Sequence, residues 1–494
     1  MSASEPGVRF PMKNRQGWVV VCFLMLALLA ADGDISVGST GQRRYLSYEE
    51  ARPVLAQLAD LLPDDLKKGP VETLPVRWQQ WIKKHDAEIR ARLIRGDEDS
   101  LVNFLLFGTS FTRQPRVTAR MLESGVTGQV AQARDLSVIV GKVIEERIDD
   151  LIRGLASPGR NERLIFLRHF VRERGYTPDT PAGRRQLRDY LLVNLRRVLD
   201  EQQSYENALR AARALGNPTE EFAARSRLYR ERGLSLDTSL RPNLAIEESL
   251  RALRDQKFLA SGSVRRVAII GPGLDFTDKQ EGYDFYPQQS LQPFALIDSL
   301  IRLGLADLDR LQVVTFDISP RVTAHLAKAR ERARRGLGYT LQLPRDPRLK
   351  WTPELIAYWQ RFGETIGRSV SPLPVPGGIG PLELRAVHVR PKVVRQITPY
   401  DLNVIVEHYT LPSSERFDLI IATNVFVYYD VLDQSLALAN IERMLRPGGF
   451  LLSNNAVLEL PGTRMRSVGY KTVIYSDRPD DGDHIVWYRR QPDQ

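Results

Sequence analysis

The chain has 494 residues, of which 43% are hydrophobic and 26% charged, and it carries a formal charge of +10. This length exceeds what one hydrophobic core organises, so two or three domains are expected, and the composition excludes a disordered chain or one with many membrane spans. The positive charge is an arginine surplus spread over predicted helices. Because the arginines are distributed rather than clustered, they favour a solvated helical surface over a concentrated basic patch that binds acidic partners.

The N-terminus has the pattern of an export signal. Basic residues, among them Lys13 and Arg15, precede the apolar run WVVVCFLMLALLAA, and small residues follow up to Gly33. Residues 1–33 are therefore predicted to be a secretory signal peptide or an N-terminal anchor, which makes the protein exported or membrane-anchored, with membrane contact only through this segment. The alternative is a cytoplasmic protein whose start codon is misassigned, with Met25 as the true start.

Cysteine and histidine usage excludes several kinds of site. Cys22, inside the apolar run, is the only cysteine, so the rest of the chain has no disulfide framework or catalytic thiol. The six histidines show no ligand spacing, and no metal site is predicted.

Residues 35–250 are predicted to form a mostly helical domain of unknown function. Ser47 is a candidate N-cap, and Thr180 followed by Pro181 begins a long amphipathic helix with leucines on one face. Arginines cover its other face, at positions 184, 185, 188, 196 and 197. They leave nucleic-acid binding open, although the absence of interleaved aromatic residues favours a solvated helix face.

From about residue 260 the pattern changes to alternating strands and helices. Strands are predicted at Val267–Ile270, Leu311–Ile318, VVRQITPYDL, FDLIIATNVFVYY and GFLLSNNAV, and the alternating tail YKTVIYSDRPDDGDHIVWYRR predicts an antiparallel hairpin. Such alternation indicates a mostly parallel, Rossmann-like sheet with right-handed crossovers. The predicted fold class is therefore an α/β domain over residues 260–494, with a C-terminal antiparallel hairpin, preceded by the helical domain.

Polar residues and glycines follow the successive strands of this predicted sheet. Gly271 and Gly273 come after the first strand, Asp317 ends the second, Asp401 ends the third and Asn424 follows the apolar run of the fourth. Ligands of doubly wound sheets bind at the carboxyl ends of the strands, so these residues are expected to surround one ligand.

Over residues 264–490 the chain resembles class I S-adenosylmethionine-dependent methyltransferases. The most characteristic part is FDLIIATNVFVYYD followed by ALANIERMLRPGGFLLSNN, which is similar in particular to the chemotaxis-receptor branch. The resemblance implies methyl transfer to an unidentified acceptor, with S-adenosylmethionine as cofactor. It places around the cofactor Gly271, Gly273, Asp275, Asp317, Ile318, Asp401, Leu402, Asn424 and Val425.

The resemblance also assigns each of these residues a role. The glycines pass the methionine part, Asp317 holds the ribose with Ile318 packed on the adenine, Asp401 and Leu402 meet the adenine edge, and Asn424 and Val425 form the floor. No catalytic residue is predicted, since the methyl group of a sulfonium is already activated and positioning supplies most of the rate.

The chain departs from the family pattern at two positions. The family has an acid two places before the first glycine, where this chain has Ile269, and a third glycine where this chain has Asp275. Asp275 is the candidate to replace the lost carboxylate at the cofactor's amino group. The departures keep a non-catalytic, exported binding protein as an alternative; an NAD-dependent oxidoreductase fits less well, because its third glycine is absent.

Two insertions are candidates for acceptor selection. TDKQEGYDFYPQQS lengthens the connection between the first and second strands, and residues 340–383 carry TPELIAYWQRFG and a Pro/Gly-rich stretch. Surface elaboration is the alternative for both.

Overall fold

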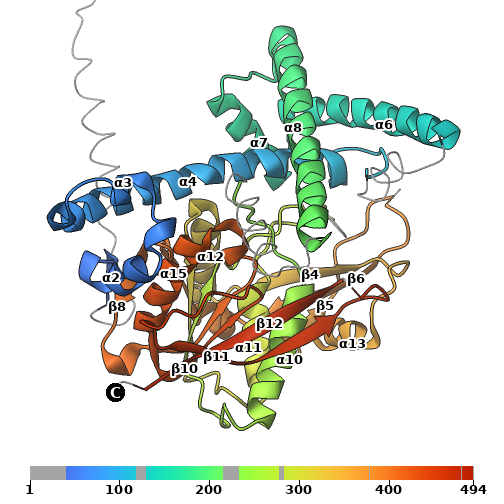
Figure 1. The fold of residues 1–494 in the computed structure, drawn as a ribbon. Coiled ribbons are helices and arrows are strands. Elements are labelled where there is room, and N and C mark those ends of the chain that lie inside the picture. The colour runs from blue at the N-terminus through green and yellow to red at the C-terminus, as the bar shows by residue number, and fades with distance from the viewer. Residues whose placement is uncertain are drawn as a thin grey trace, which may run out of the picture.

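The computed structural model describes residues 41–117, 130–214, 233–277, 283–377, 379–479 and 481–492. The predicted signal or anchor, residues 1–33, lies outside these ranges and stays a prediction. Within the described ranges, no helix is both long and apolar enough to cross a membrane. Figure 1 shows a helical N-terminal half lying across an α/β C-terminal half.

The N-terminal half is helical, as predicted. It consists of α2 (Tyr48–Gln57), η1 (Ala59–Leu61), α3 (Asp64–Lys67), η2 (Val71–Thr73), α4 (Leu74–Phe107), α6 (Val130–Ala156), α7 (Glu162–Glu173) and α8 (Pro181–Ala214). Ser47 caps α2 with a capping box, since its hydroxyl accepts from the Glu50 N–H while Glu50 accepts from the Ser47 N–H. Thr180 accepts from the Gly183 N–H at the start of α8. Both predicted caps are therefore confirmed.

Helix α4 belongs to two hydrophobic cores. Near its start, Trp78 and Ile82 pack in the cluster that covers one face of the C-terminal sheet. Near its end, Leu101 and Leu105 pack with residues of α6, α7 and α8. Figure 1 shows the consequence: α4 runs along the top of the α/β half, and the other long helices gather at one end of it.

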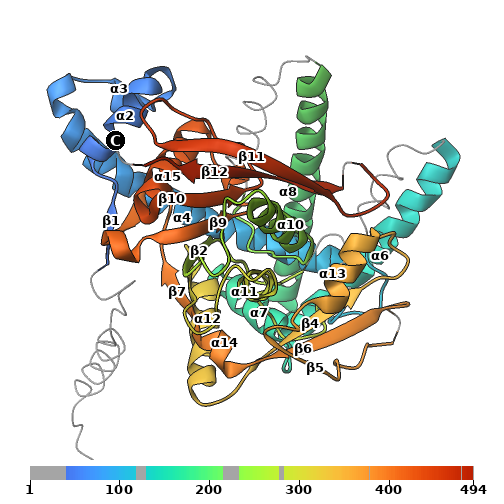
Figure 2. The ribbon, with the colours of Figure 1, turned by 90° about the horizontal axis from the view of Figure 1, so that it is seen from below.

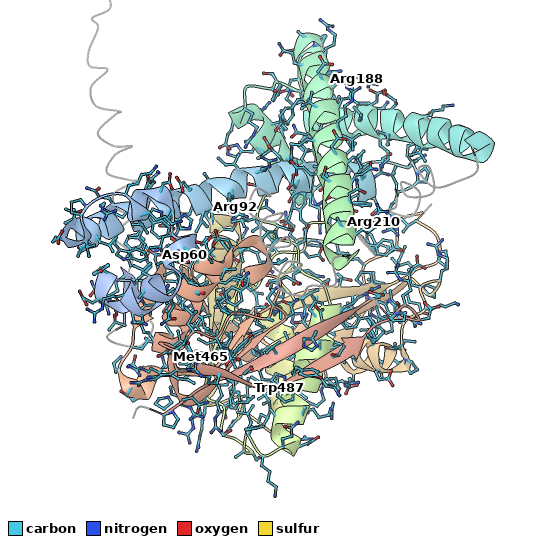
Figure 3. All side chains as sticks on the ribbon, in the orientation of Figure 1. Asp60, Arg92, Arg188, Arg210, Met465 and Trp487 are labelled. Carbon is cyan, nitrogen blue, oxygen red and sulfur yellow. The ribbon has the colours of Figure 1, made fainter. Side chains whose placement is uncertain are left out.

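Two arginines of α8 pair with acids, mostly on neighbouring helices. Arg188, labelled in Figure 3, pairs with Glu145 and Asp149 of α6. Arg197 lies 2.7 Å from Asp99 of α4 and 3.2 Å from Glu201 of α8. These pairs neutralise part of the helix face, which favours the structural interpretation over nucleic-acid binding.

The C-terminal half is built on a seven-stranded sheet in the order β11-β12-β10-β9-β2-β3-β7. Its strands are β2 (Arg266–Ile270), β3 (Gln312–Asp317), β7 (Ile397–Asp401), β9 (Phe417–Ala422), β10 (Leu445–Ser453), β11 (Met465–Ile474) and β12 (Gly482–Arg490). The first five are mutually parallel, and β12 runs antiparallel to both β10 and β11. The mostly parallel sheet and its antiparallel hairpin are thus confirmed.

Helices cover both faces of this sheet, because successive side chains of each strand point to opposite faces and both faces are apolar. Val267 and Ile269 of β2 pack on the side of α10 and α11, whereas Ala268 and Ile270 pack on the side of α2, α4 and α15. Figure 2 shows α10 and α11 on the face turned toward the viewer. The helices of this half are α10 (Arg241–Asp255), α11 (Gln292–Arg302), α12 (Pro320–Arg334), α13 (Pro353–Arg361), α14 (Pro391–Arg395) and α15 (Val431–Met444).

The third and fourth predicted strands are much shorter in the structure, and one predicted insertion contains regular secondary structure. The third strand begins only at Ile397, because α14 takes the residues before it, and the fourth ends at Ala422. Asn424 then adopts a φ of 58°, which no strand continues, and η4 (Phe426–Tyr428) follows. Within residues 340–383 the chain contributes to a three-stranded antiparallel sheet of β4 (Tyr339–Arg345), β6 (Glu383–Val389) and β5 (Gly367–Val370), whereas residues 371–377 and 379–382 form no helix or strand and are mostly exposed.

Elements of the N-terminal half pack against the C-terminal half. Strand β1 (Gln42–Tyr45) pairs antiparallel with β8 (Glu407–Thr410), which is followed in the chain by η3 (Ser413–Glu415). Helix α10 lies partly within the predicted helical range 35–250, yet it packs against β11, β12 and α11. The division into residues 35–250 and 260–494 stays a prediction.

Candidate functional site

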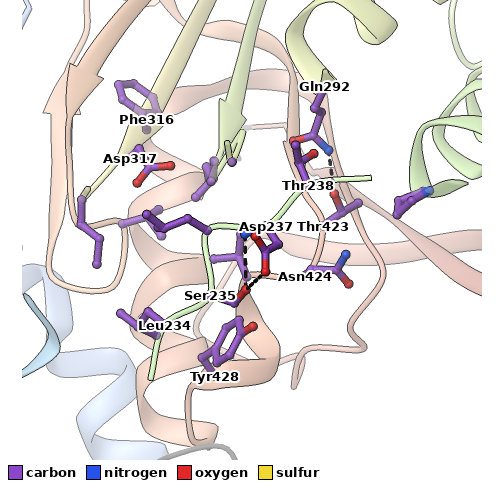
Figure 4. A pocket seen from close by; sticks show the side chains of 18 of the residues that line it. Leu234, Ser235, Asp237, Thr238, Gln292, Phe316, Asp317, Thr423, Asn424 and Tyr428 are labelled. Carbon is purple, nitrogen blue, oxygen red and sulfur yellow. Dashed lines mark hydrogen bonds between the residues drawn. The ribbon is translucent and has the colours of Figure 1, made fainter. Parts of the chain in front are cut away.

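A pocket lies at the carboxyl ends of β2, β3 and β9, next to the point where the strand order reverses. Ligands of open α/β sheets bind at this place, because the loops of neighbouring strands diverge there and leave a crevice. The pocket is lined by Leu93, residues 234–239, Pro242, Asn243, Ile270, Gly271, Gly273, Gln292, residues 316–318, residues 402–404, residues 423–425, Tyr428 and Tyr429. Figure 4 shows part of this lining.

The turn after β2 requires glycine at two positions. Gly271 and Gly273 have φ angles of +64° and +72°, in the left-handed region that favours glycine. A Cβ on Gly271 would lie 2.9 Å from Cγ2 of Val425, and one on Gly273 would lie 2.8 Å from the Leu236 carbonyl oxygen. The turn therefore brings bare backbone to the wall of the pocket.

Asp317, the last residue of β3, places a buried carboxylate in the pocket wall. Its Oδ1 accepts a hydrogen bond from the Ser319 N–H at 2.8 Å. Burial raises the pKa of Asp317 to about 7, and the nearby Asp401 carboxylate adds to the increase, while hydrogen bonds from the backbone of Ser319 and Gly273 oppose it. A carboxylate in this position gains from any ligand that donates hydrogen bonds to it.

The turn after β9 is fixed by an amide pair. Oδ1 of Asn454 accepts from the Asn424 N–H at 2.8 Å, and Nδ2 of Asn454 donates to Oδ1 of Asn424 at 2.6 Å. Arg92 of α4 donates to the Tyr428 carbonyl at 2.9 Å and lies 5.5 Å from the centre of the Tyr429 ring. Figure 3 labels Arg92 on α4, above the sheet. The helical half thus holds the loop that closes one side of the pocket.

The order of the strands identifies the fold. Numbered in chain order within the large sheet, the strands lie as 3-2-1-4-5-7-6, with the seventh reversed. Residues 384–453, from β6 to the end of β10, match the family profile of a methyltransferase domain. The C-terminal half has the class I methyltransferase fold. Its kinship to the chemotaxis-receptor branch stays a prediction.

Solved structures of methyltransferases are similar to this chain at low identity. The glycopeptide N-methyltransferase MtfA is 12% identical with a TM-score of 0.24, over 51% of this chain and 96% of that one. The magnesium protoporphyrin IX methyltransferase ChlM from Synechocystis PCC 6803, solved with bound SAM, is 11% identical with a TM-score of 0.24, over 50% of this chain and 79% of that one. A search of curated protein sequences found no match.

The methyltransferase domain brings most of the predicted site residues into the pocket. These are Gly271, Gly273, Asp317, Ile318, Leu402, Asn424 and Val425. Their convergence follows from the parallel strands, whose carboxyl ends meet at one edge of the sheet.

The structure does not bring Asp275 and Asp401 into this pocket. The buried Asp275 carboxylate accepts from the Tyr286 hydroxyl at 2.8 Å and from Nε2 of Gln289 at 3.2 Å, and it does not line the pocket. Asp401 instead lies 2.8 Å from Arg43 and 2.7 Å from Arg90, both from the N-terminal half. Asp401 thus ties β7 to β1 and α4.

The segment Gly233–Ser239 supplies much of the pocket lining, although none of its residues was predicted to lie there. It has no regular secondary structure and crosses α4 at Gly96, where a Cβ would lie 2.0 Å from the Leu234 carbonyl oxygen. The Leu236 carbonyl accepts from the Leu274 N–H at 2.7 Å, which fastens the segment to the glycine turn. The letters GLSLDTS carry no period or motif, so only the long-range contacts reveal their place.

Proposed function

We propose that the methyltransferase domain binds S-adenosylmethionine in this pocket and transfers its methyl group to an acceptor. One observation carries the proposal: the buried Asp317 carboxylate ends β3 directly beside the left-handed Gly271–Gly273 turn, at the switch point of a methyltransferase sheet. The solved MtfA and ChlM complexes with this cofactor are consistent with the proposal.

The residues around the pocket suit the chemical groups of the cofactor. Asp317 can accept hydrogen bonds from two ribose hydroxyls, which would stabilise its charged form. Ile318 and Leu402 offer apolar surface to the adenine. The glycine turn admits the methionine part, because a Cβ at either glycine would crowd this wall.

When bound, the cofactor supplies a sulfonium methyl group that is already activated for transfer. The work of the chain is then to hold the donor, to align an acceptor with it and to keep water away. The exposed Asn424 and the half-buried Tyr428 line the pocket, and the loop that carries them is held by Arg92 and Asn454. These residues would face an acceptor.

Calorimetric titration of the full chain with S-adenosylmethionine and S-adenosylhomocysteine tests the proposal. The full chain is needed because a fragment starting at residue 255 lacks the lining residues 234–243. We expect saturable binding that Asp317→Ala abolishes. The matched control is Asp401→Asn, which changes a strand-end carboxylate outside the pocket and should keep binding. Absence of heat with the wild-type chain at millimolar ligand contradicts the proposal.

A further inference from the structure

A further cavity, which we call the loop cavity, is lined by the loop that follows α4 and by parts of the insertion around the three-stranded sheet. Its volume is about 880 Å³, and its described lining has no residue in common with that of the methyltransferase pocket. A cavity of this size suits a small organic molecule better than a single inorganic ion. The described lining consists of Thr109, residues 112–116, Arg348, Pro376, Gly377, Ile379 and Gly380.

The side chains around the loop cavity carry positive charge. Among the described lining residues the charged ones are Arg113, Arg116 and Arg348, and none is an aspartate or a glutamate. Arg113 is exposed and pairs with no acid of the described ranges. Arg116 is half-buried, and its guanidinium carbon lies 4.6 Å from the centre of the Tyr283 ring. Both guanidinium groups can therefore donate hydrogen bonds to a ligand.

One carboxylate near the loop cavity compensates part of this charge. Asp346 accepts from Nε of Arg348 at 2.9 Å and from Nη2 at 2.6 Å. Asp346 also interacts electrostatically with Arg116, but it is buried and does not line the cavity. A single carboxylate faces three guanidinium groups, so the cavity keeps an excess of positive charge.

A buried cation lies behind the cavity wall. Arg147 of α6 is fully buried and donates to the carbonyl groups of Gln114 and Pro115, both at 3.0 Å, and these two residues line the cavity. Burial lowers the pKa of Arg147 to about 10, and the charge of Arg116 adds to the decrease, whereas two nearby aspartates oppose it. A negative charge in the cavity would offset the repulsion between Arg147 and Arg116.

The loop that carries the first two arginines has a fixed backbone. Oδ1 of Asp284 accepts from the Thr109 N–H at 2.7 Å and from the Ser110 N–H at 3.1 Å. At the other end of the loop, the Val117 N–H donates to the Leu106 carbonyl at 2.8 Å. A backbone that is already ordered costs little additional entropy when a ligand binds, so the loop is suited to recognition.

We propose that the loop cavity binds a small organic molecule that carries two or more oxyanion groups, phosphates or carboxylates. Guanidinium groups bind both kinds, because their N–H donors match pairs of oxygen atoms. Arg113 and Arg116 each offer such a group without a carboxylate in contact, which is why more than one oxyanion is expected. The inference does not depend on the proposed function, because the two sites have separate linings.

Calorimetric titration of the full chain with tripolyphosphate and with citrate tests the inference. Tripolyphosphate carries phosphate groups and citrate carries carboxylates, so the two arms identify the kind of oxyanion. We expect saturable binding of at least one of them at about 0.1 M salt, where charges more than about 10 Å apart are largely screened. Loss of a charge-assisted hydrogen bond predicts that Arg113→Gln and Arg116→Gln each weaken this binding by about 10-fold.

Two further variants serve as comparisons. Arg310→Gln removes the same charge from an exposed position before β3 that does not line the cavity, and it should change the affinity by less than about twofold. Arg116→Lys keeps the charge without the guanidinium fork and should keep part of the affinity. If Arg116→Gln does not fold, the exposed Arg113→Gln decides the test, since its side chain makes no polar contact in the described ranges.

The adverse outcomes are distinct. Absence of heat with both anions at millimolar concentration overturns the inference, as does an affinity that neither Arg113→Gln nor Arg116→Gln lowers. An equal loss in Arg310→Gln would show attraction by net charge alone and also overturns it. So does competition with S-adenosylhomocysteine, which would place the anion in the methyltransferase pocket. A chain that binds an anion but not S-adenosylhomocysteine rejects the proposed function and keeps this inference.

Discussion

Replacement of Asp317 by asparagine should stabilise the ligand-free protein while it abolishes cofactor binding. The side chain keeps its size and can still accept from the Ser319 N–H, but it no longer carries a charge in a buried position. Residues that serve a ligand are often unfavourable for the empty protein, because their charges await a partner. Asp317 has this character, since burial raises the pKa of its carboxyl group.

The size of the stability difference between Asp317→Asn and wild type follows from the pKa of Asp317, which is about 7 instead of its ordinary 3.8. Because the folded value is the higher one, the protonated carboxyl contributes stability that is fully present below pH 3.8 and lost as the pH rises through about 7. Asparagine does not titrate. Each pH unit between these values is worth about 1.4 kcal/mol, so the advantage of Asp317→Asn should grow by about 2–3 kcal/mol between about pH 5 and pH 8.5.

Urea unfolding of wild type and variant at these two pH values measures the difference directly. A second pair of curves, recorded with S-adenosylhomocysteine, should narrow the stability difference between variant and wild type at pH 8.5. At 100 times its dissociation constant a ligand adds about 2.7 kcal/mol to a protein that binds it, and the variant should gain none of this. Affinity of the wild type should also fall below about pH 7, as Asp317 becomes protonated.

An equal stability difference between wild type and Asp317→Asn at both pH values would contradict this prediction. In that case the carboxylate does not titrate with a raised pKa in the folded protein. An Asp317→Asn variant that still binds S-adenosylhomocysteine with wild-type affinity contradicts the ribose role instead.

Two further substitutions test how the helical half supports the pocket. Gly96→Ala should lower the urea midpoint and weaken S-adenosylhomocysteine binding, because the new Cβ would lie 2.0 Å from the Leu234 carbonyl oxygen. The matched control is Gly141→Ala in α6, which has open space around it and should gain up to about 1 kcal/mol; equal effects of the two would contradict the crossing at Gly96. Arg163→Met should cost at least about 3 kcal/mol in urea unfolding, because buried carbonyl groups lose a charged donor. Arg163 is 1% exposed and donates to the backbone carbonyl groups of Asp275, Phe276, Asp284 and Tyr286. An unchanged urea midpoint would therefore show that these hydrogen bonds do not stabilise the fold.

Features encoded over a few neighbouring residues could be predicted from the sequence. Ser47 and Thr180 cap the helices that follow them, as their side-chain chemistry indicates. The apolar β-branched runs form β2 and β3, and their ends carry the Gly271 turn and Asp317 into one pocket. The parallel arrangement then makes strand ends converge, which explains why most of the predicted site residues lie together.

The predicted strand boundaries were wrong where a tertiary contact competes with the local sequence pattern. Apolar residues after Ala422 continue the run of β9, but the hydrogen bonds between Asn424 and Asn454 turn the chain away from the sheet. The pairing of β5 with β6 was not predicted, because the two strands are separated by the Pro/Gly-rich residues 371–382 and a distant strand partner leaves no local signal in the sequence.

The amino-acid sequence by itself thus determined the methyltransferase sheet, the glycine turn and the buried acid at the end of β3. Only the tertiary structure decided which other acids face the pocket. Asp275 and Asp401 are drawn to partners outside it, whereas Asp237 reaches its lining. The physical reason is that a carboxylate turns toward its nearest donors, and those donors come from distant parts of the chain.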